Sequence, residues 1–245
     1  MWLDDFAVLV RLQSLSCLNH HPKIGEEAAD PDFAYMLSEG VYASQTRRRF
    51  ILRYLIMPLL GVRTPHYIVF ILRDRLFGDL LDSRYRAETL MLIAVHVAIA
   101  ATAVWAGVVL DLLLFWWLPY VTAFAMIGWL SELSEHFPMM RAGLNESMYA
   151  ARNRYAAWYE RLFIGMHGDN YHLTHHLLPQ ILHWNLGEAT GILREDAEFR
   201  AWDSLWGGIF SRQTPQRVSF IGFVIKNHVS AVSGRLSAPN AETVI

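Results

Sequence analysis

The feature that most constrains the fold is a long apolar stretch in the middle of the chain. Between Glu88 and Glu132 the only formal charge is Asp111, which divides the stretch into uncharged halves of 22 and 20 residues. As α-helix, each half is about 30 Å long, which matches the thickness of the hydrocarbon core of a bilayer. We therefore expect an all-α, multi-pass integral membrane protein with a helical hairpin at about residues 89–131.

The composition supports a membrane protein and argues against a nucleic-acid-binding one. Hydrophobic residues make up 53% of the 245 residues and charged residues 18%, whereas soluble proteins average about 25% charged residues. The alternative is a buried helix pair in a soluble protein, but the remaining chain is too short to surround one. The net charge of −2 predicts no nucleic-acid partner.

Two positions in the apolar stretch carry specific expectations. Gly107 and Asp111 are expected to mark a tight turn between the two crossings. His96 lies within the first crossing, where an ionisable group is a functional candidate in principle. The alternative, which we favour, is a neutral imidazole hydrogen bonded to the partner helix.

The hairpin has a topological consequence. Two crossings return the chain to its starting side, so segments before and after the hairpin can meet there. Residues 47–86 contain nine Arg and no Lys, and the positive-inside rule makes their side cytoplasmic. Their apolar runs are short, so we expect interfacial amphipathic helices, with an ordinary soluble helix surface as the alternative.

Histidines gather after the apolar stretch, in a segment that runs from His167 to His176. On a helix, His172, His175 and His176 share one face, because they are spaced i, i+3 and i+4. Three neutral imidazoles on one face suit iron, zinc, copper or nickel; a packed or surface cluster is the alternative. His167 lies off this face and reaches a metal only if a loop intervenes at Gly168.

A second segment near the start, Cys17-Leu-Asn-His20-His21, repeats the spacing His-x-x-His-His with Cys17 in the first position. It is followed by Asp30 and Asp32. These carboxylates fit hydrogen-bonding partners of a ligand histidine, and they equally fit turn and helix-cap chemistry.

These segments resemble the membrane fatty acid desaturase and hydroxylase superfamily, over residues 15–190. That family carries three histidine boxes and a further histidine between the second and third. The resemblance implies that the second and third boxes and the intervening ligand of this chain bind the metal, through His20, His21, His136, His172, His175 and His176.

The resemblance also implies a chemistry. Family members use a non-heme di-iron centre and dioxygen to desaturate or hydroxylate acyl lipids or similar substrates. The electrons come from an external donor such as a ferredoxin or a cytochrome b5-type protein. We expect no catalytic residue beyond the metal ligands. Residues 1–230 would form one desaturase-like domain carrying the histidine boxes on cytoplasmic helices, followed by a loose tail at 231–245.

The chain departs from the family pattern at its start. The first box, His-x-x-x-His, and the membrane segments that precede it are absent. The alternative hypothesis is therefore a truncated, catalytically inactive member that retains a partial metal site. A small metal transporter is a third hypothesis, which the crossings disfavour because they offer only His96 and Asp111. Beyond the third box, residues 187–212 predict one amphipathic cytoplasmic helix.

Overall fold

A computed structural model describes residues 20–62, 64–83, 85–141 and 147–232. Within these ranges the chain is all helical, with an isolated bridge between Trp206 and Val218 in place of a sheet. The all-α prediction is thus confirmed for this part of the chain. Cys17 and the predicted tail from residue 233 onward lie outside the described residues.

The described residues form two compact units, each with its own packing. We call residues 53–129 the apolar unit, and residues 20–52 with 130–232 the histidine unit. The prediction of a single domain over residues 1–230 stays a prediction.

The apolar unit consists of helices with several π-helical stretches. Its longest helix is α7, Arg86–Ala106. The other elements are η2 (Ile51–Ile56), which begins in the histidine unit, α4 (Met57–Leu59), α5 (Thr64–Phe70), η3 (Ile71–Phe77), α6 (Gly78–Leu81), α8 (Val109–Leu112), η4 (Leu113–Trp117), η5 (Tyr120–Phe124) and the first part of α9 (Ala125–His136).

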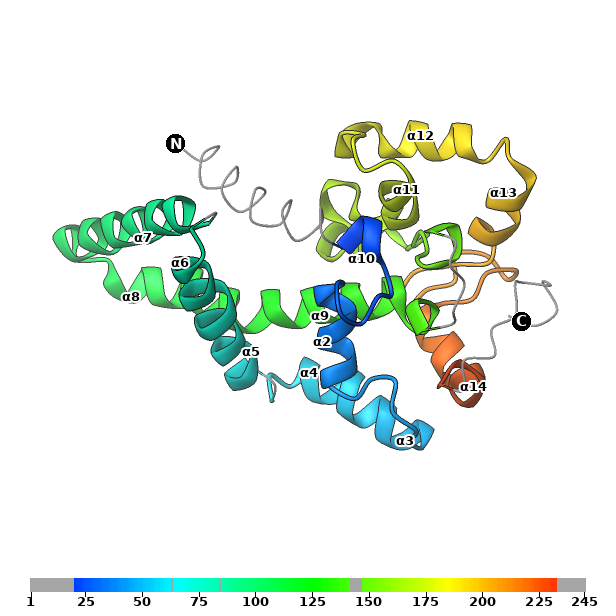
Figure 1. The fold of residues 1–245 in the computed structure, drawn as a ribbon, viewed down its shortest axis with the longest axis horizontal. Coiled ribbons are helices and arrows are strands. Elements are labelled where there is room, and N and C mark those ends of the chain that lie inside the picture. Colours follow the sequence, from blue (N-terminus) through cyan, green and yellow to red (C-terminus); the bar gives the residue numbers. More distant parts are fainter. Residues whose placement is uncertain (1–19, 63, 84, 142–146, 233–245) are drawn as a thin grey trace. The chain divides into compact units, whose positions relative to one another are not determined.

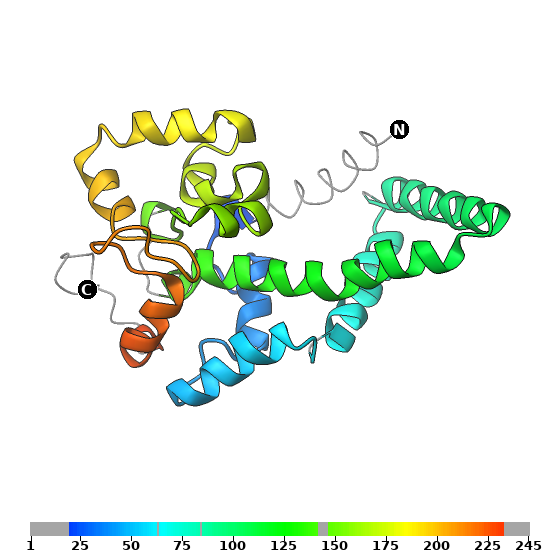
Figure 2. The same ribbon diagram turned by 180° about the vertical axis from the view of Figure 1, so that it is seen from behind.

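Helix α7 ends at Gly107, which adopts the left-handed conformation with φ +72°. The N–H of Val108 then bonds to the carbonyl of Ala103 at 2.9 Å, as in a Schellman cap. The turn is therefore at Gly107 and Val108, whereas Asp111 lies inside α8. Figures 1 and 2 both show α7 and α8 side by side.

Among the residues that the structure describes, two helices are long and apolar enough to cross a membrane, Arg86–Ala106 and Val109–His136. In their most apolar stretches only 11% and 0% of the residues are buried. A core helix of a soluble protein would be mostly buried. The His96 ring lies 5.4 Å from that of Trp117. Its Nδ1 bonds to the carbonyl of Leu92, so the hydrogen bond is within its own helix and not to the partner helix as predicted.

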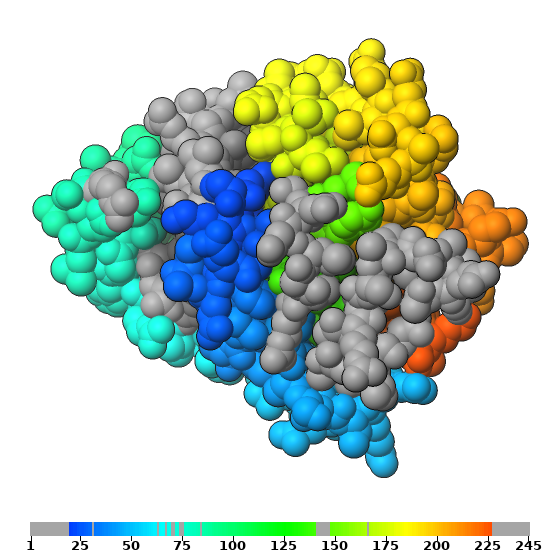
Figure 3. Space-filling model, turned by 45° about the vertical axis from the view of Figure 1, so that its right-hand side comes forward, coloured from blue at the N-terminus to red at the C-terminus, as the bar shows by residue number. Residues whose placement is uncertain are grey.

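The histidine unit is built of short helices. In chain order these are η1 (His21–Lys23), α2 (Pro31–Ser38), α3 (Arg47–Phe50), the end of α9, η6 (Met139–Arg141), η7 (Ser147–Tyr149), α10 (Trp158–Phe163), η8 (Met166–Tyr171), α11 (His172–Leu177), η9 (His183–Asn185), α12 (Leu186–Leu193), α13 (Ala197–Asp203) and α14 (Phe220–Val232). In the space-filling view α12 and α13, yellow to orange, are part of its surface (Figure 3).

The prediction of one helix over residues 187–212 was wrong. The chain forms α12 and α13 instead, because Asp196 accepts from the N–H groups of Glu198 and Phe199 and so starts a new helix. Trp202 and Trp206 are buried. Their side chains belong to the core of the unit.

Ala150–Arg154, a segment of the histidine unit that is neither helix nor strand, is called here the buried segment. All its residues are buried. Its backbone forms hydrogen bonds with residues of other segments. The Arg154 N–H donates to the Asn170 carbonyl at 2.7 Å, and the Ala151 carbonyl accepts from Trp202 Nε1 at 3.0 Å. The segment therefore contacts both η8, through Asn170, and α13, through Trp202.

Candidate metal centre

The structure brings the six predicted histidines together within the histidine unit. They come from the start of η1, the end of α9 and helix α11. The ring centroids of His20 and His136 are 4.9 Å apart, and those of His136 and His172 are 4.7 Å apart. The His21 ring stacks on that of His176 at 4.2 Å. Their role as metal ligands stays a prediction, but their convergence does not depend on it.

Four of these rings form an inner group: His20, His136, His172 and His176. The Nε2 atoms of His136 and His172 are 2.8 Å apart, and those of His172 and His176 are 3.0 Å apart. Nε2 of His20 is buried and has no hydrogen-bond partner in the protein. The ligand atoms of His20, His136 and His176 all lie within 4.8 Å of one another.

The opposite nitrogen is hydrogen bonded in two of these rings and faces a carboxylate in a third. Nδ1 of His20 lies 2.7 Å from Asp30 Oδ1, and Nδ1 of His136 lies 3.1 Å from the Ala150 carbonyl. Nδ1 of His172 faces Glu135 Oε2 at 3.4 Å. Oxygen acceptors place the ring proton on Nδ1, so the Nε2 lone pairs point inward.

Asp30 performs both tasks that the sequence left open. Its Oδ1 accepts from His20 and from the N–H groups of Asp32 and Phe33 at the start of α2, and its Oδ2 accepts from Gly25. Burial alone would raise the pKa of Asp30, but the hydrogen bond and charge of His20 lower it below its usual value. Asp30 is therefore a carboxylate that fixes a ring and a helix start together.

The remaining two histidines form an outer pair beside the inner group. The rings of His21 and His175 are 4.6 Å apart, and Nδ1 of His21 is buried without a partner. The His175 ring is 6.3 Å from that of His172. Of the three rings predicted to share a helix face, those of His172 and His176 are 4.6 Å apart, whereas the His175 ring lies nearer to His21 than to either of them.

Burial keeps the imidazoles of His21, His172, His175 and His176 neutral. It lowers the pKa of His172 and His176 far below the usual value, and neighbouring histidines add to the effect. It also lowers the pKa of His175, and that of His21 to about 4. At neutral pH these rings carry lone pairs and no charge, which is the form in which histidine binds metals.

This donor set fits a transition metal. The Nε2 atom of His172 lies 2.8 Å from that of His136 and 3.0 Å from that of His176. Lone pairs on nitrogens this close repel each other unless a cation or a proton lies between them. Nitrogens on neighbouring positions of one metal lie about 3 Å apart when each bond is about 2.1 Å. An all-imidazole set with oxygen acceptors behind it is suited to iron, zinc, copper or nickel.

Comparison with known proteins decides the family. Residues 15–204 match the family model "Fatty acid desaturase". The chain belongs to the fatty acid desaturase family. It is 32% identical over 197 residues to a dihydrorhizobitoxine desaturase of Bradyrhizobium elkanii, an alignment that covers 78% of this chain. The chain spans 55% of the length of that curated relative. No solved structure matches.

In this desaturase-family chain, His167 is not part of the cluster of rings. A loop does intervene, since His167 and Gly168 have φ of +58° and +79°. That loop brings the His167 ring to 5.4 Å from the ring of His183.

Sequence reasoning missed two acidic residues. Glu132 and Glu135 precede His136 on α9 at spacings of i−4 and i−1, so all three share one side of the helix. Glu135 is buried, and its Oε1 lies 2.6 Å from Nη2 of Arg154. The pattern Glu-x-x-Glu-His at the end of an apolar helix was the signal that would have found them.

A second set of hydrogen bonds anchors α11 to the buried segment. Asn153 Oδ1 accepts from the N–H of Thr174, while its Nδ2 donates to Asp203 at 2.8 Å. Asp203 also accepts from Tyr155 and Arg194. These buried partners hold the helix that carries three of the histidines.

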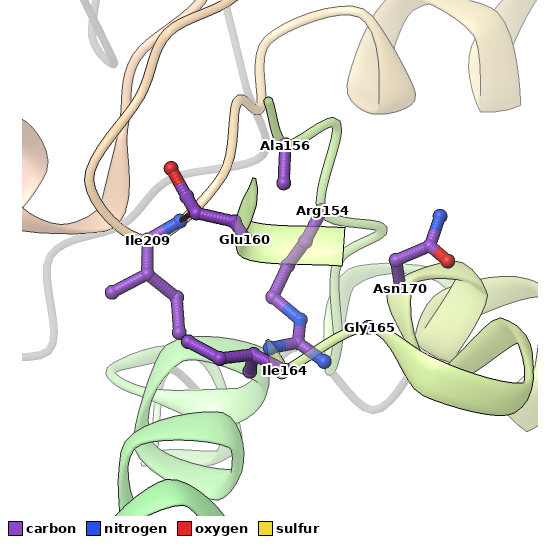
Figure 4. Close-up of a pocket in the computed structure, with 7 residues that line it drawn as sticks. All are labelled: Arg154, Ala156, Glu160, Ile164, Gly165, Asn170 and Ile209. Atoms are coloured by element: carbon purple, nitrogen blue, oxygen red, sulfur yellow. Dashed lines mark hydrogen bonds between the residues drawn. The ribbon is translucent and has the colours of Figure 1, made fainter. Parts of the chain in front are cut away.

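A small cavity lies beside this framework. Arg154, Glu160 and Asn170 are among the residues that line it (Figure 4). Its volume is about 10 Å³, which is room for about one water molecule. The cavity is thus too small for an organic substrate.

Proposed function

We propose that this chain is a membrane-bound, non-heme di-iron oxygenase of the fatty acid desaturase/hydroxylase type. It acts on an acyl lipid or similar substrate with dioxygen and an external electron donor. The observation that carries the proposal is the convergence of inward-facing Nε2 lone pairs from three separate segments. No side chain can oxidise an unactivated C–H bond unaided, so a cofactor is required.

The inner group would hold iron through Nε2 of its four histidines, and the outer pair would add His21 and His175. Iron bound in this way supplies the activation of dioxygen that removes hydrogen from a C–H bond. The protein's own part is orientation. Asp30 and the Ala150 carbonyl would accept the Nδ1 protons of His20 and His136, and Glu135 Oε2 faces Nδ1 of His172.

The membrane arrangement is part of the proposal. Helix α7 and the helix from Val109 onward would cross as a hairpin, returning the chain to one side. The Arg-rich residues 47–86 would make that side cytoplasmic. The lipid bilayer and a ferredoxin or cytochrome b5-type protein would be the partners.

The relative's name widens the range of substrates. It is a desaturase of dihydrorhizobitoxine, so the substrate of this chain need not be an acyl lipid. The second candidate function is a catalytically inactive member with a partial metal site. It is favoured by the outer pair, which contributes only two imidazoles.

The test is turnover by the iron-loaded protein in lipid vesicles. A reduced ferredoxin or cytochrome b5, dioxygen and candidate acyl lipids would be supplied, and products followed by mass spectrometry. We expect loss of two hydrogens or gain of one oxygen. His175→Ala should abolish turnover, and His183→Ala should leave it unchanged. Iron-loaded wild-type protein that forms no product would favour the inactive alternative.

A further inference from the structure

The buried segment Ala150–Arg154 contacts both helices that carry the later histidines. The Ala150 carbonyl engages His136, and Asn153 engages the backbone of α11 at Thr174. Arg152 donates to the Phe137 carbonyl, directly after α9. Arg154 makes the remaining contacts, and these lead to His172.

Arg154 is a buried cation between two carboxylates. Its side chain is 4% exposed, and its Nη2 lies 2.6 Å from Glu135 Oε1. The same atom pairs with Asp169 Oδ2, and Ser131 Oγ donates to that carboxylate at 3.0 Å. The Arg154 backbone is fixed as well, by the N–H bond to the Asn170 carbonyl.

The two oxygens of Glu135 have separate partners. Oε1 forms an ion pair with Arg154 and accepts a hydrogen bond from the Ser131 hydroxyl at 3.3 Å. Oε2 faces Nδ1 of His172 at 3.4 Å. Nε2 of His172 faces the inner group, so Glu135 lies on the Nδ1 side of the ring. Its carboxylate also lies close enough to His136 and His172 for the three residues to offer ligand atoms within 4.8 Å of one another. With Arg154 on one oxygen, the carboxylate is held in the rotation that presents the other to His172.

We propose that Arg154 is a positioning residue of the metal centre, which acts through Glu135 to orient the His172 ring. The proposal rests on the metal site proposed above. Without the guanidinium, Glu135 has no cation to fix its rotation, and its Oε2 is no longer held facing Nδ1 of His172. The ring can then turn its Nε2 away from His136 and His176. Partners of this kind behind a ligand change metal affinity about 10–100-fold.

The test is titration of the full-length, metal-free protein in detergent with Co²⁺, followed by its visible absorption. Arg154→Gln should bind Co²⁺ about 10–100-fold more weakly than the wild type. Arg154→Lys, which keeps a charge but not the fork of donors, should fall between them. The control is Arg161→Gln, an exposed arginine of α10, which should bind Co²⁺ like the wild type.

A purely structural role is separated by a double variant. Glu135→Ala alone should weaken Co²⁺ binding to a similar degree. If Arg154 acts through Glu135, adding Arg154→Gln to Glu135→Ala causes no further loss of affinity. If Arg154 only stabilises the fold, affinity follows the thermal midpoint of each variant, or the two losses multiply, and the proposal is overturned.

The outcomes also separate this proposal from the function on which it rests. Wild-type protein that binds no Co²⁺ contradicts the metal site and overturns both. Wild-type protein that binds Co²⁺ while Arg154→Gln binds it equally well overturns only the role of Arg154. If Arg154→Gln does not fold, Arg154→Lys decides: wild-type affinity overturns the proposal and weakened affinity at an unchanged thermal midpoint supports it.

Discussion

Asp30 and Asp196 are a matched pair of helix-capping aspartates that differ in one contact. Each accepts from two backbone N–H groups at the start of a helix, α2 and α13 respectively. Only Asp30 also engages a histidine, through His20 Nδ1 at 2.7 Å. The difference separates the structural task from the metal-related one.

Asp30→Ala should therefore lower both stability and metal affinity. Loss of the cap costs about 1 kcal/mol, and loss of the partner of His20 should weaken Co²⁺ binding about 10–100-fold. Asp196→Ala should lower the thermal midpoint but leave Co²⁺ affinity unchanged. Equal effects of the two substitutions on metal affinity would show that Asp30 does no more than cap a helix.

The histidine pKa values predict how acid affects the metal-free protein. Burial, followed by the charges of His175 and His20, lowers the pKa of His21 from 6.5 to about 4. The unfolded chain therefore binds a proton there that the folded chain does not. Above pH 6.5 the His21 ring is neutral in both states and does not reduce the free energy of unfolding. The free energy of unfolding then falls as the pH drops from 6.5 toward 4. The pKa values of His172, His175 and His176 shift in the same direction.

Thermal midpoints of the metal-free protein measured across this pH range would check the prediction. The wild type should lose stability steadily with acid, and His21→Gln should lose less. A midpoint that rises as the pH falls would contradict neutral, buried rings.

At the scale of elements, the loop between η1 and α2 depends on Gly25. Its φ is +77°, and a Cβ built there would lie 2.7 Å from the backbone carbonyl oxygen of Met140. Gly191, in α12, has open space around its Cβ position. The two glycines therefore predict opposite effects of the same substitution.

Gly25→Ala should destabilise the protein by more than about 1 kcal/mol, because both the backbone conformation and the space are wrong. It should also displace His20 and Asp30, which flank the loop, and so weaken Co²⁺ binding. Gly191→Ala should raise the free energy of unfolding by about 0.5–1 kcal/mol. Denaturant titration of both variants gives the comparison, and a neutral Gly25→Ala would contradict the packing of this loop.

The sequence predicted the elements whose pattern is local. The helix from Arg86 ends at Gly107, because a left-handed residue closes it. The apolar run of this helix and the glycine that ends it can both be read from the sequence. The break between α12 and α13 was missed, because the cap at Asp196 outweighs the apolar periodicity. The buried segment was missed because a buried segment that is neither helix nor strand has no periodic hydrophobic pattern.

The site was predicted in part for the same reason. Histidine spacing pointed to His172, His175 and His176 and to the pair His20 and His21, and the family resemblance added His136. The separation of His175 from His172 and His176 depends on the position of His21, which no local pattern gives. Arg154 was missed because its partners Glu135 and Asp169 come from other elements.

At the scale of the whole molecule, the hairpin proposal predicts opposite exposure of two sites. In a Cys17→Ser background, Asp111→Cys lies next to the turn and Glu195→Cys lies between α12 and α13. An impermeant maleimide should label Asp111→Cys only from outside the cell and Glu195→Cys only from the cytoplasmic side. Labelling of both from one side would show that the two apolar helices do not cross as a pair.

The central claim is that the six converging histidines hold iron. The most direct measurement is the iron content per chain of the detergent-purified protein, by elemental mass spectrometry, beside His136→Ala and His183→Ala. We expect close to two irons per chain in the wild type and in His183→Ala, with a marked loss in His136→Ala. Iron near zero in the wild type, or equal iron in all three proteins, would contradict it.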